Sequence, residues 1–365
     1  MKNWHFILLI MVIAGISLQA CTDDEGGNES DDSENDFTAL LTNQIDGVIL
    51  PAMEAYQDEM TDFESAVQGV SLPLDNGALT SLRNAFSEAY TAYQVAAVHD
   101  YFSTSSIGLT ERTNLYPIDL TVLETLVDSE SNNFGSDDHE RADGFPAIDF
   151  MLYGSDDVLA YFNEDEKRLA FLNALVSNMK TISDDLVSQW TSLREPFSES
   201  AGTGLGSAIS GQLNGSLAYY EFTIREDKVG IPIGLVGPND SPITPDATKI
   251  EAFYRSQADG NDNFALSLVR TAVEEMEKIY LGTNSSGVNG QGYDDLLTAR
   301  DQESIDADIK AQFQSIYTEI DSRSSITEDN NRELYDLIQG LVTLYKSDLF
   351  PILNIQDADG ANDGD

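Results

Sequence analysis

The sequence predicts an all-α protein made of two tandem helical bundles. Apolar residues recur with a helical period along nearly the whole chain, and no strand-like alternation of useful length occurs. The pattern breaks at residues 194–204, which contain Pro196 and two glycines. About four helical segments lie on each side of this break, which is enough for an antiparallel bundle in each half.

Seven apolar stripes mark the expected helices, and their Met and Tyr side chains are expected in the core. Pro51 should kink or split the first helix, because proline lacks an amide donor and clashes with the preceding turn. Gly282 follows the fifth stripe as a C-cap. The predicted bundles are residues 37–195 and 196–355. The stripes cover residues 41–67, 82–97, 169–190, 209–224, 265–279, 305–320 and 334–345.

Three irregular stretches interrupt this pattern, at residues 101–117, 128–145 and 226–247. Long loops in a compact helical protein are where binding sites usually lie. These stretches are therefore the first place to look for a site.

The N-terminus reads as a lipoprotein signal peptide over residues 1–20. Lys2 is its only charge, and the apolar run 6–16 is too short to span a membrane but suits a secretory signal. Residues 18–21 have the form of a lipobox, so acylated Cys21 would anchor the chain in a lipid bilayer. A secreted protein with an incidental Cys is the alternative. Residues 21–36 and 356–365 are acidic and are expected to be a disordered tether and tail.

The net charge of the chain is −45, from 64 acidic and 19 basic residues. Such a chain repels nucleic acid, so no nucleic-acid partner is expected. Most of the carboxylates should be solvated, so the charge does not by itself make a metal site. The single Cys excludes disulfides and thiolate metal sites, and a domain of this size buries enough core without them.

Four segments together resemble a known family. Residues 144–154 begin Gly-Phe-Pro-Ala-Ile-Asp and end in an apolar run and Gly154, residues 116–119 read Tyr-Pro-Ile-Asp, and residues 228–234 read Lys-Val-Gly-Ile-Pro-Ile-Gly. The ending, residues 347–355, completes the set. In this order the segments are similar to those of the imelysin family of bacterial envelope proteins. That family's signature reads G-x-H-x-x-E, and here Pro146 stands in the slot of the His and Asp149 in the slot of the Glu.

The resemblance implies an all-α fold of two bundle-like halves, with the signature segment near their junction. It also implies an outer-membrane or periplasmic location and a link to iron acquisition or to peptidase activity. For this chain it favours an outer-membrane lipoprotein on either the periplasmic or the cell-surface face.

The altered signature allows two interpretations. A His and a Glu three residues apart share one helix face and could bind one metal; Pro146 cannot be a ligand, whereas Asp149 could. A cation such as iron or calcium would then be held by Asp149 together with Asp119, Glu111 or Asp227, each of which is otherwise a solvated acid. In the structural alternative, Pro146 begins a helix and Asp149 interacts with that helix's dipole.

Histidines contribute little to a metal site. His99 is expected to be a cap or surface residue, and His139 is expected to be solvated in a polar loop. A zinc hydrolase needs three protein ligands, and no paired-His spacing exists. Residues 357–365 resemble a calcium loop without its final Glu, and a disordered acidic tail is the alternative.

The sequence therefore favours a non-catalytic lipoprotein that binds a cation, an iron complex or a partner protein during nutrient uptake. We expect no catalytic residues. The alternatives are a metal-dependent peptidase that uses Asp149 and loop carboxylates, and a structural partner of an outer-membrane uptake receptor. The binding residues expected at the junction are Glu111, Tyr116, Asp119, Gly144, Pro146, Asp149, Asp227, Pro232 and Gly234.

Overall fold

The computed structural model describes residues 32–136, 141–200, 202–237, 242–258, 263–327 and 332–358. Within these ranges the regular structure is helical, apart from one isolated bridge between Thr283 and Asn289, and the all-α prediction is confirmed. None of the helices described is long and apolar enough to cross a bilayer. The signal peptide, Cys21 and His139 lie outside the described residues.

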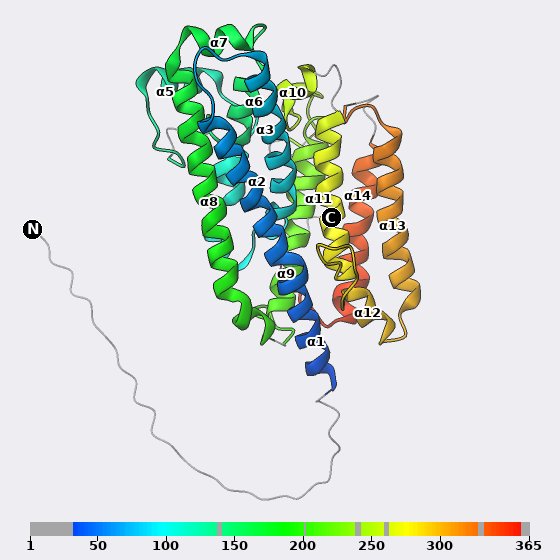
Figure 1. Cartoon of the computed structure of the whole chain (residues 1–365). Helices are drawn as coiled ribbons and strands as arrows, with labels where there is room; N and C mark the ends of the chain where they lie inside the picture. The colour runs from blue at the N-terminus through cyan, green and yellow to red at the C-terminus, as the bar shows by residue number, and fades with distance from the viewer. Residues whose placement is uncertain are drawn as a thin grey trace, which may run out of the picture.

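The N-terminal half is built on three long helices, with α2 packed against both α3 and α8 (Figure 1). Shorter helices gather at one end of this bundle, where α6 contacts α3 and α8. The elements are α1 (Asp32–Asn43), η1 (Gln44–Ile49), α2 (Leu50–Gln68), α3 (Asn76–Ala97), η2 (Phe102–Ser106), α4 (Leu109–Thr113), α5 (Leu120–Ser129), α6 (Gly144–Tyr153), α7 (Val158–Glu164) and α8 (Glu166–Ser198).

The C-terminal half packs α11, α13 and α14 together, with the π-helix η4 against α14 and α11. Helix α11 lies against α3, and the short α10 lies against α6, so both contacts join the two halves (Figure 1). The elements are α9 (Ala208–Ala218), η4 (Tyr219–Gly230), η6 (Ala247–Lys249), α10 (Phe253–Ala258), α11 (Asn263–Leu281), α12 (Tyr293–Thr298), α13 (Glu303–Ser322), α14 (Glu333–Leu344), η8 (Tyr345–Leu349) and α15 (Phe350–Ile352).

Two prolines inside helices each follow a π-helical turn. Pro51 is the second residue after η1, and Pro351 is the second residue after η8. In an α-helix a proline ring clashes with the carbonyl four residues earlier. The wider π-helical turn covers that residue in both cases. The helical path therefore runs through η1 and continues past Pro51 into α2. The kink or split expected at Pro51 is present as a π-helical turn.

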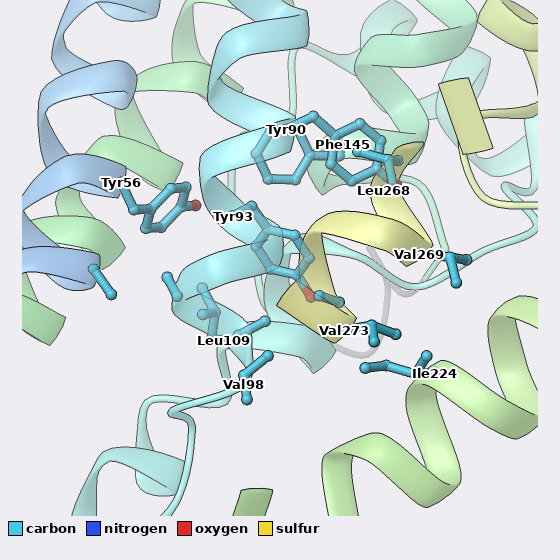
Figure 2. Packing of buried hydrophobic residues seen from close by; sticks show 14 of the residues in the cluster. Tyr56, Tyr90, Tyr93, Val98, Leu109, Phe145, Ile224, Leu268, Val269 and Val273 are labelled. Carbon is cyan, nitrogen blue, oxygen red and sulfur yellow. The ribbon is translucent and has the colours of Figure 1, made fainter. Parts of the chain in front are cut away.

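The core runs through both halves without a break. Figure 2 shows the rings of Phe145 and Tyr90 lying together with Leu268 beside them. Phe145 belongs to α6 and Leu268 to α11. The rings of Tyr90 and Phe145 stack with centroids 4.3 Å apart and planes inclined by 2°. Both rings are fully buried, and Tyr93 packs beside Phe145 at 5.2 Å. This aromatic layer fixes the position of α6 and hence of the signature segment.

The ends of the predicted domains differ in detail from the structure. Helix α1 begins at Asp32, so five residues assigned to the tether are helical. Helix α8 continues through Pro196 to Ser198, past the predicted boundary. The start of the predicted tail is attached to α9, because the amide of Ala358 donates to Asn214 Oδ1 at 2.8 Å. The division into two domains stays a prediction, as does the calcium loop, most of which lies outside the described residues.

Candidate binding site at the junction of the two halves

The signature segment starts helix α6 against α4. Gly144 has φ of +68°, a conformation that favours glycine, and a Cβ at this position would lie 2.1 Å from the Thr113 carbonyl oxygen. Pro146 follows within the first turn of α6, where its missing amide costs nothing. Gly144 therefore allows the start of α6 to pack closely against α4, and Pro146 is compatible with the first turn of that helix.

Asp149 caps the start of α10, which belongs to the other half of the molecule. Its side chain is 2% exposed, and its Oδ2 and Oδ1 accept the backbone amides of Tyr254 and Arg255 at 2.8 and 2.9 Å. Burial raises the pKa of the Asp149 carboxyl to about 7, against the opposing effect of these two hydrogen bonds. The expected interaction of Asp149 with the dipole of its own helix is replaced by this contact with α10.

The residues present at the altered signature do not fit a metal. Pro146 offers no donor, and both oxygens of Asp149 accept amides. Asp119 is exposed and caps α5, where its Oδ1 accepts the amides of Thr121 and Val122 at 2.9 and 3.1 Å. Among the described residues, no group of three or more His, Cys, Asp or Glu could hold an ion.

A fully buried polar cluster, which we call the junction network, lies beside these contacts. Lys228 from η4 forms an ion pair with Glu251, and neither residue is exposed to solvent. Glu251 Oε1 accepts from Gln94 Nε2 at 2.9 Å and from Asn114 Nδ2 at 2.7 Å. Lys228 Nζ also donates to Gln94 Oε1 at 2.8 Å. The junction network thus joins α3 and the end of α4 to two segments of the C-terminal half.

A second buried charged contact joins the halves at the end of α3. His99 is fully buried, and its Nε2 lies 2.8 Å from Glu275 Oε1 on α11. Burial alone would raise the pKa of Glu275, but His99 and then Lys278, 3.1 Å from its Oε2, outweigh burial and lower it. The expectation that His99 is a cap or surface residue is wrong, because its partner comes from the other half.

Two cavities open next to the junction network. The first, which we call the charged chamber, has a volume of about 320 Å³. Its lining includes Tyr116, Arg141, Thr223, Asp227 and Lys249. The second, which we call the aromatic chamber, has a volume of about 210 Å³. Its lining includes Tyr116, Pro117, Pro146, Ile250, Phe253 and Tyr254.

The charged chamber contains polar groups that the protein leaves available. The Tyr116 hydroxyl is buried and has no hydrogen-bond partner among the described residues. Burial raises its pKa well above the usual value, so it stays protonated and can donate. Arg141 and Lys249 line the same chamber, and neither forms an ion pair with any residue that the structure describes. Asp227 has an exposed side chain, yet desolvation by the surrounding protein raises its pKa to about 6.

The predicted site residues divide into three groups. Tyr116 and Asp227 line the charged chamber, and Pro146 and Asp149 line the aromatic chamber. Glu111 is exposed on α4 and lines neither, although its charge adds to the burial that raises the pKa of Asp100 to about 7. Asp119 and Gly144 also act outside the chambers, as the cap of α5 and the start of α6.

Pro232 and Gly234 shape the loop that follows η4. The Pro232 carbonyl accepts the amide of Asp246, and the Gly234 carbonyl accepts that of Ile243, both at 2.9 Å. Gly234 has φ of +77°, and a Cβ there would lie 2.4 Å from the Ile243 carbonyl oxygen. The loop thereby holds the segment that leads to Lys249.

Sequence reasoning missed Arg141, Lys249 and the roles of Gln94, Asn114 and Glu251 in the junction network. Gln94 carries no local signal, because it is a single polar residue in an otherwise apolar run, and Asn114 carries none, because it is one of several polar residues in a row. Arg141 and Lys249 did carry one. Both lie next to or within a predicted irregular stretch, in a chain with only 19 basic residues.

Comparisons with known proteins agree with this fold. The model of the family described as Imelysin (Peptidase M75) matches residues 49–347 of the chain. A structure named as that of an iron-regulated protein A precursor from Parabacteroides distasonis ATCC 8503 superposes with a TM-score of 0.72 at 15% identity, covering 90% of this chain and 96% of that one. A structure of an imelysin-like protein from Psychrobacter arcticum 273-4 superposes with a TM-score of 0.71 at 16% identity, covering 90% and 98%. No curated protein sequence matches the chain.

Proposed function

The chain belongs to the imelysin family, and on that premise we propose that it is an envelope binding protein whose charged chamber takes a small anionic ligand. The observation that carries this proposal is the lining of the chamber. Arg141 and Lys249 meet there with the unpartnered hydroxyl of Tyr116. Binding is proposed without catalysis, because the groups at the altered signature are engaged in holding the two halves together.

The two basic side chains in the lining of the charged chamber indicate an anionic ligand. Acidic residues outnumber basic ones by 64 to 19, so two cations in one small cavity run against the composition of the chain. An arginine fork matches the geometry of a carboxylate, and a lysine adds a point charge. Asp227, with its pKa raised to about 6, can meet a hydroxyl or an amide of the same ligand. A carboxylate-bearing ligand suits these groups.

A ferric chelate is the first ligand to test. One structure similar in fold is named for an iron-regulated protein, and carboxylate chelates of iron are anionic. In the full proposal the chain is acylated at Cys21, faces the periplasm or the cell surface, and passes its ligand to an uptake receptor. The peptidase alternative requires a metal that the residues of the altered signature do not fit.

The proposal is tested by calorimetric titration of the full-length protein in detergent with ferric citrate and with citrate. We expect saturable binding of one ligand per chain, weakened at least about tenfold in Arg141→Gln and in Lys249→Gln. Lys180→Gln is the control, because Lys180 pairs with Asp184 on the exposed side of α8. Absence of saturable binding, or equal binding by the Arg141 and Lys180 variants, would refute the proposal.

The same protein is titrated with Fe³⁺, Zn²⁺ and Ca²⁺ alone. We expect only weak binding at several sites that added salt suppresses, as solvated surface carboxylates give. One tight ion per chain that is lost in Asp149→Ala would overturn the conclusion that the altered signature does not fit a metal. Such a result would return the peptidase to consideration.

A further inference from the structure

The two chambers lie directly beside each other. Tyr116 and Pro117 line both and form a shared wall. On one short segment Thr248 and Ile250 line the aromatic chamber, whereas Lys249 between them lines the charged chamber. Neighbouring Cα atoms are only about 3.8 Å apart. The two chambers therefore adjoin, and a ligand that occupies both must pass between them beside Tyr116.

The aromatic chamber has the size and lining for a single ring. Its volume of about 210 Å³ exceeds the ~150 Å³ at which an apolar cavity in a protein binds benzene. The rings of Phe253 and Tyr254 meet edge to face at 5.1 Å, and Tyr254 makes the same contact with Phe150 at 5.1 Å. These rings are already held in place, so a bound ring can pack against them without ordering the site.

The carboxylate of Asp149, which lines the aromatic chamber, is already engaged and does not interact with the ligand. Among the described residues that line this chamber, Asp149 is the only charged one, and both of its oxygens accept backbone amides of α10. Pro146 stands in the position that a metal ligand would take, and it adds a flat apolar surface to the same wall. The substitution that makes the signature unfit for a metal thus makes the chamber more suitable for a ring.

We propose that the ligand is an aryl carboxylate. Its carboxylate is bound by Arg141 and Lys249 in the charged chamber, and its ring lies in the aromatic chamber against Phe253 and Tyr116. This inference rests on the proposed function and names the ligand class of the same site. It assigns Phe253 and Leu120, which also lines the aromatic chamber, to the selection of the ligand.

The test compares benzoate, cyclohexanecarboxylate and acetate by ligand-observed NMR titration of the full-length protein. Benzoate is expected to bind at least about tenfold more tightly than acetate, because only benzoate buries a ring. Phe253→Ala should weaken benzoate at least about tenfold and leave acetate unchanged, whereas Arg141→Gln should weaken both. Phe222→Ala is the matched control, because Phe222 is 51% exposed on η4 and lines neither chamber.

A second variant keeps the test decisive if Phe253→Ala does not fold. Leu120 is 37% exposed, so Leu120→Trp should fold and fill the aromatic chamber, with loss of benzoate binding and unchanged acetate binding. Equal affinities for benzoate and acetate that both fall in Arg141→Gln would overturn the aryl class and leave the anion site standing. Cyclohexanecarboxylate binding as tightly as benzoate would overturn the preference for an aromatic ring and hence the aryl class. No binding of any of these ligands or of ferric citrate would remove the proposed function itself.

Discussion

Replacing Lys228 by Met tests the central claim about the junction, that a buried ion pair holds the two halves together. Lys228 and Glu251 are both fully buried, and Gln94 bonds to each of them. Lys228→Met keeps most of the side-chain volume but leaves the Glu251 carboxylate without its counter-charge. Breaking a buried pair by removing one partner costs about 3–5 kcal/mol, because an uncompensated charge stays inside. We expect the free energy of unfolding to fall by about that amount.

The assay is urea unfolding followed by circular dichroism, since urea adds no charge that would screen the pair. Lys180→Met is the matched control. The half-buried pair between Lys180 and Asp184 on α8 should contribute less than about 1 kcal/mol, because solvent still screens it. The double variant Lys228→Met with Glu251→Gln should lose about 2 kcal/mol less stability than the two single variants lose in sum. The reason is that a glutamine at position 251 carries no charge and still accepts a hydrogen bond from Gln94. The reasoning is refuted if Lys228→Met loses no more stability than Lys180→Met, or if the two single losses simply add.

Three further predictions concern other parts of the chain. Gly144→Ala should lower the free energy of unfolding by about 2–4 kcal/mol, because Gly144 has φ of +68° and an added Cβ would collide with Thr113. Gly204→Ala is the control and should change it by no more than about 0.5 kcal/mol, because an added Cβ there meets no atom within 4 Å. Thermal melts of both variants test this prediction. Burial raises the pKa of Asp149 to about 7, so between about pH 4 and pH 7 the folded state binds more protons than the unfolded chain. As pH rises across that window, the free energy of unfolding of wild type should fall relative to that of Asp149→Asn, by roughly 1.4 kcal/mol in total for each unit by which the pKa is raised. Urea unfolding of both proteins at several pH values measures this difference. A difference that does not change with pH would contradict the raised pKa. Cys21→Ser should abolish incorporation of labelled palmitate and release the protein from the membrane fraction; continued labelling would exclude Cys21 as the acceptor.

The long helices could be predicted from sequence because their apolar stripes are local. Stripe 41–67 corresponds to the end of α1 with η1 and α2, stripe 169–190 to α8, and stripe 265–279 to α11. Short helices such as α7 and α12 span too few turns for a period to show. The π turns of η1 and η8 have a local cause in the following proline. The 12-residue π-helix η4 has none that the sequence reveals.

The sequence predicted which residues lie near the junction better than it predicted their contacts, and their part in binding stays a prediction. Tyr116, Pro146, Asp149 and Asp227 were expected near the junction, and all four line its chambers. The role of Asp149 was missed because its partner amides lie 105 and 106 residues later in the chain. The burial of His99 was missed for the same reason, since Glu275 is 176 residues away. A single sequence gives the type of a residue and its local spacing, whereas these roles depend on contacts between the halves.

The capping of α10 by Asp149 allows the separation of α10 from α6 to be followed by amide hydrogen exchange. Helix α10 has only six residues, too few to be stable alone, and its first amides bond to a carboxylate on the opposite half. The amides of Tyr254 and Arg255 can exchange their hydrogens with solvent only when this contact separates. Their exchange rates therefore report how often α10 leaves Asp149, and a ligand that bridges the chambers should slow both together.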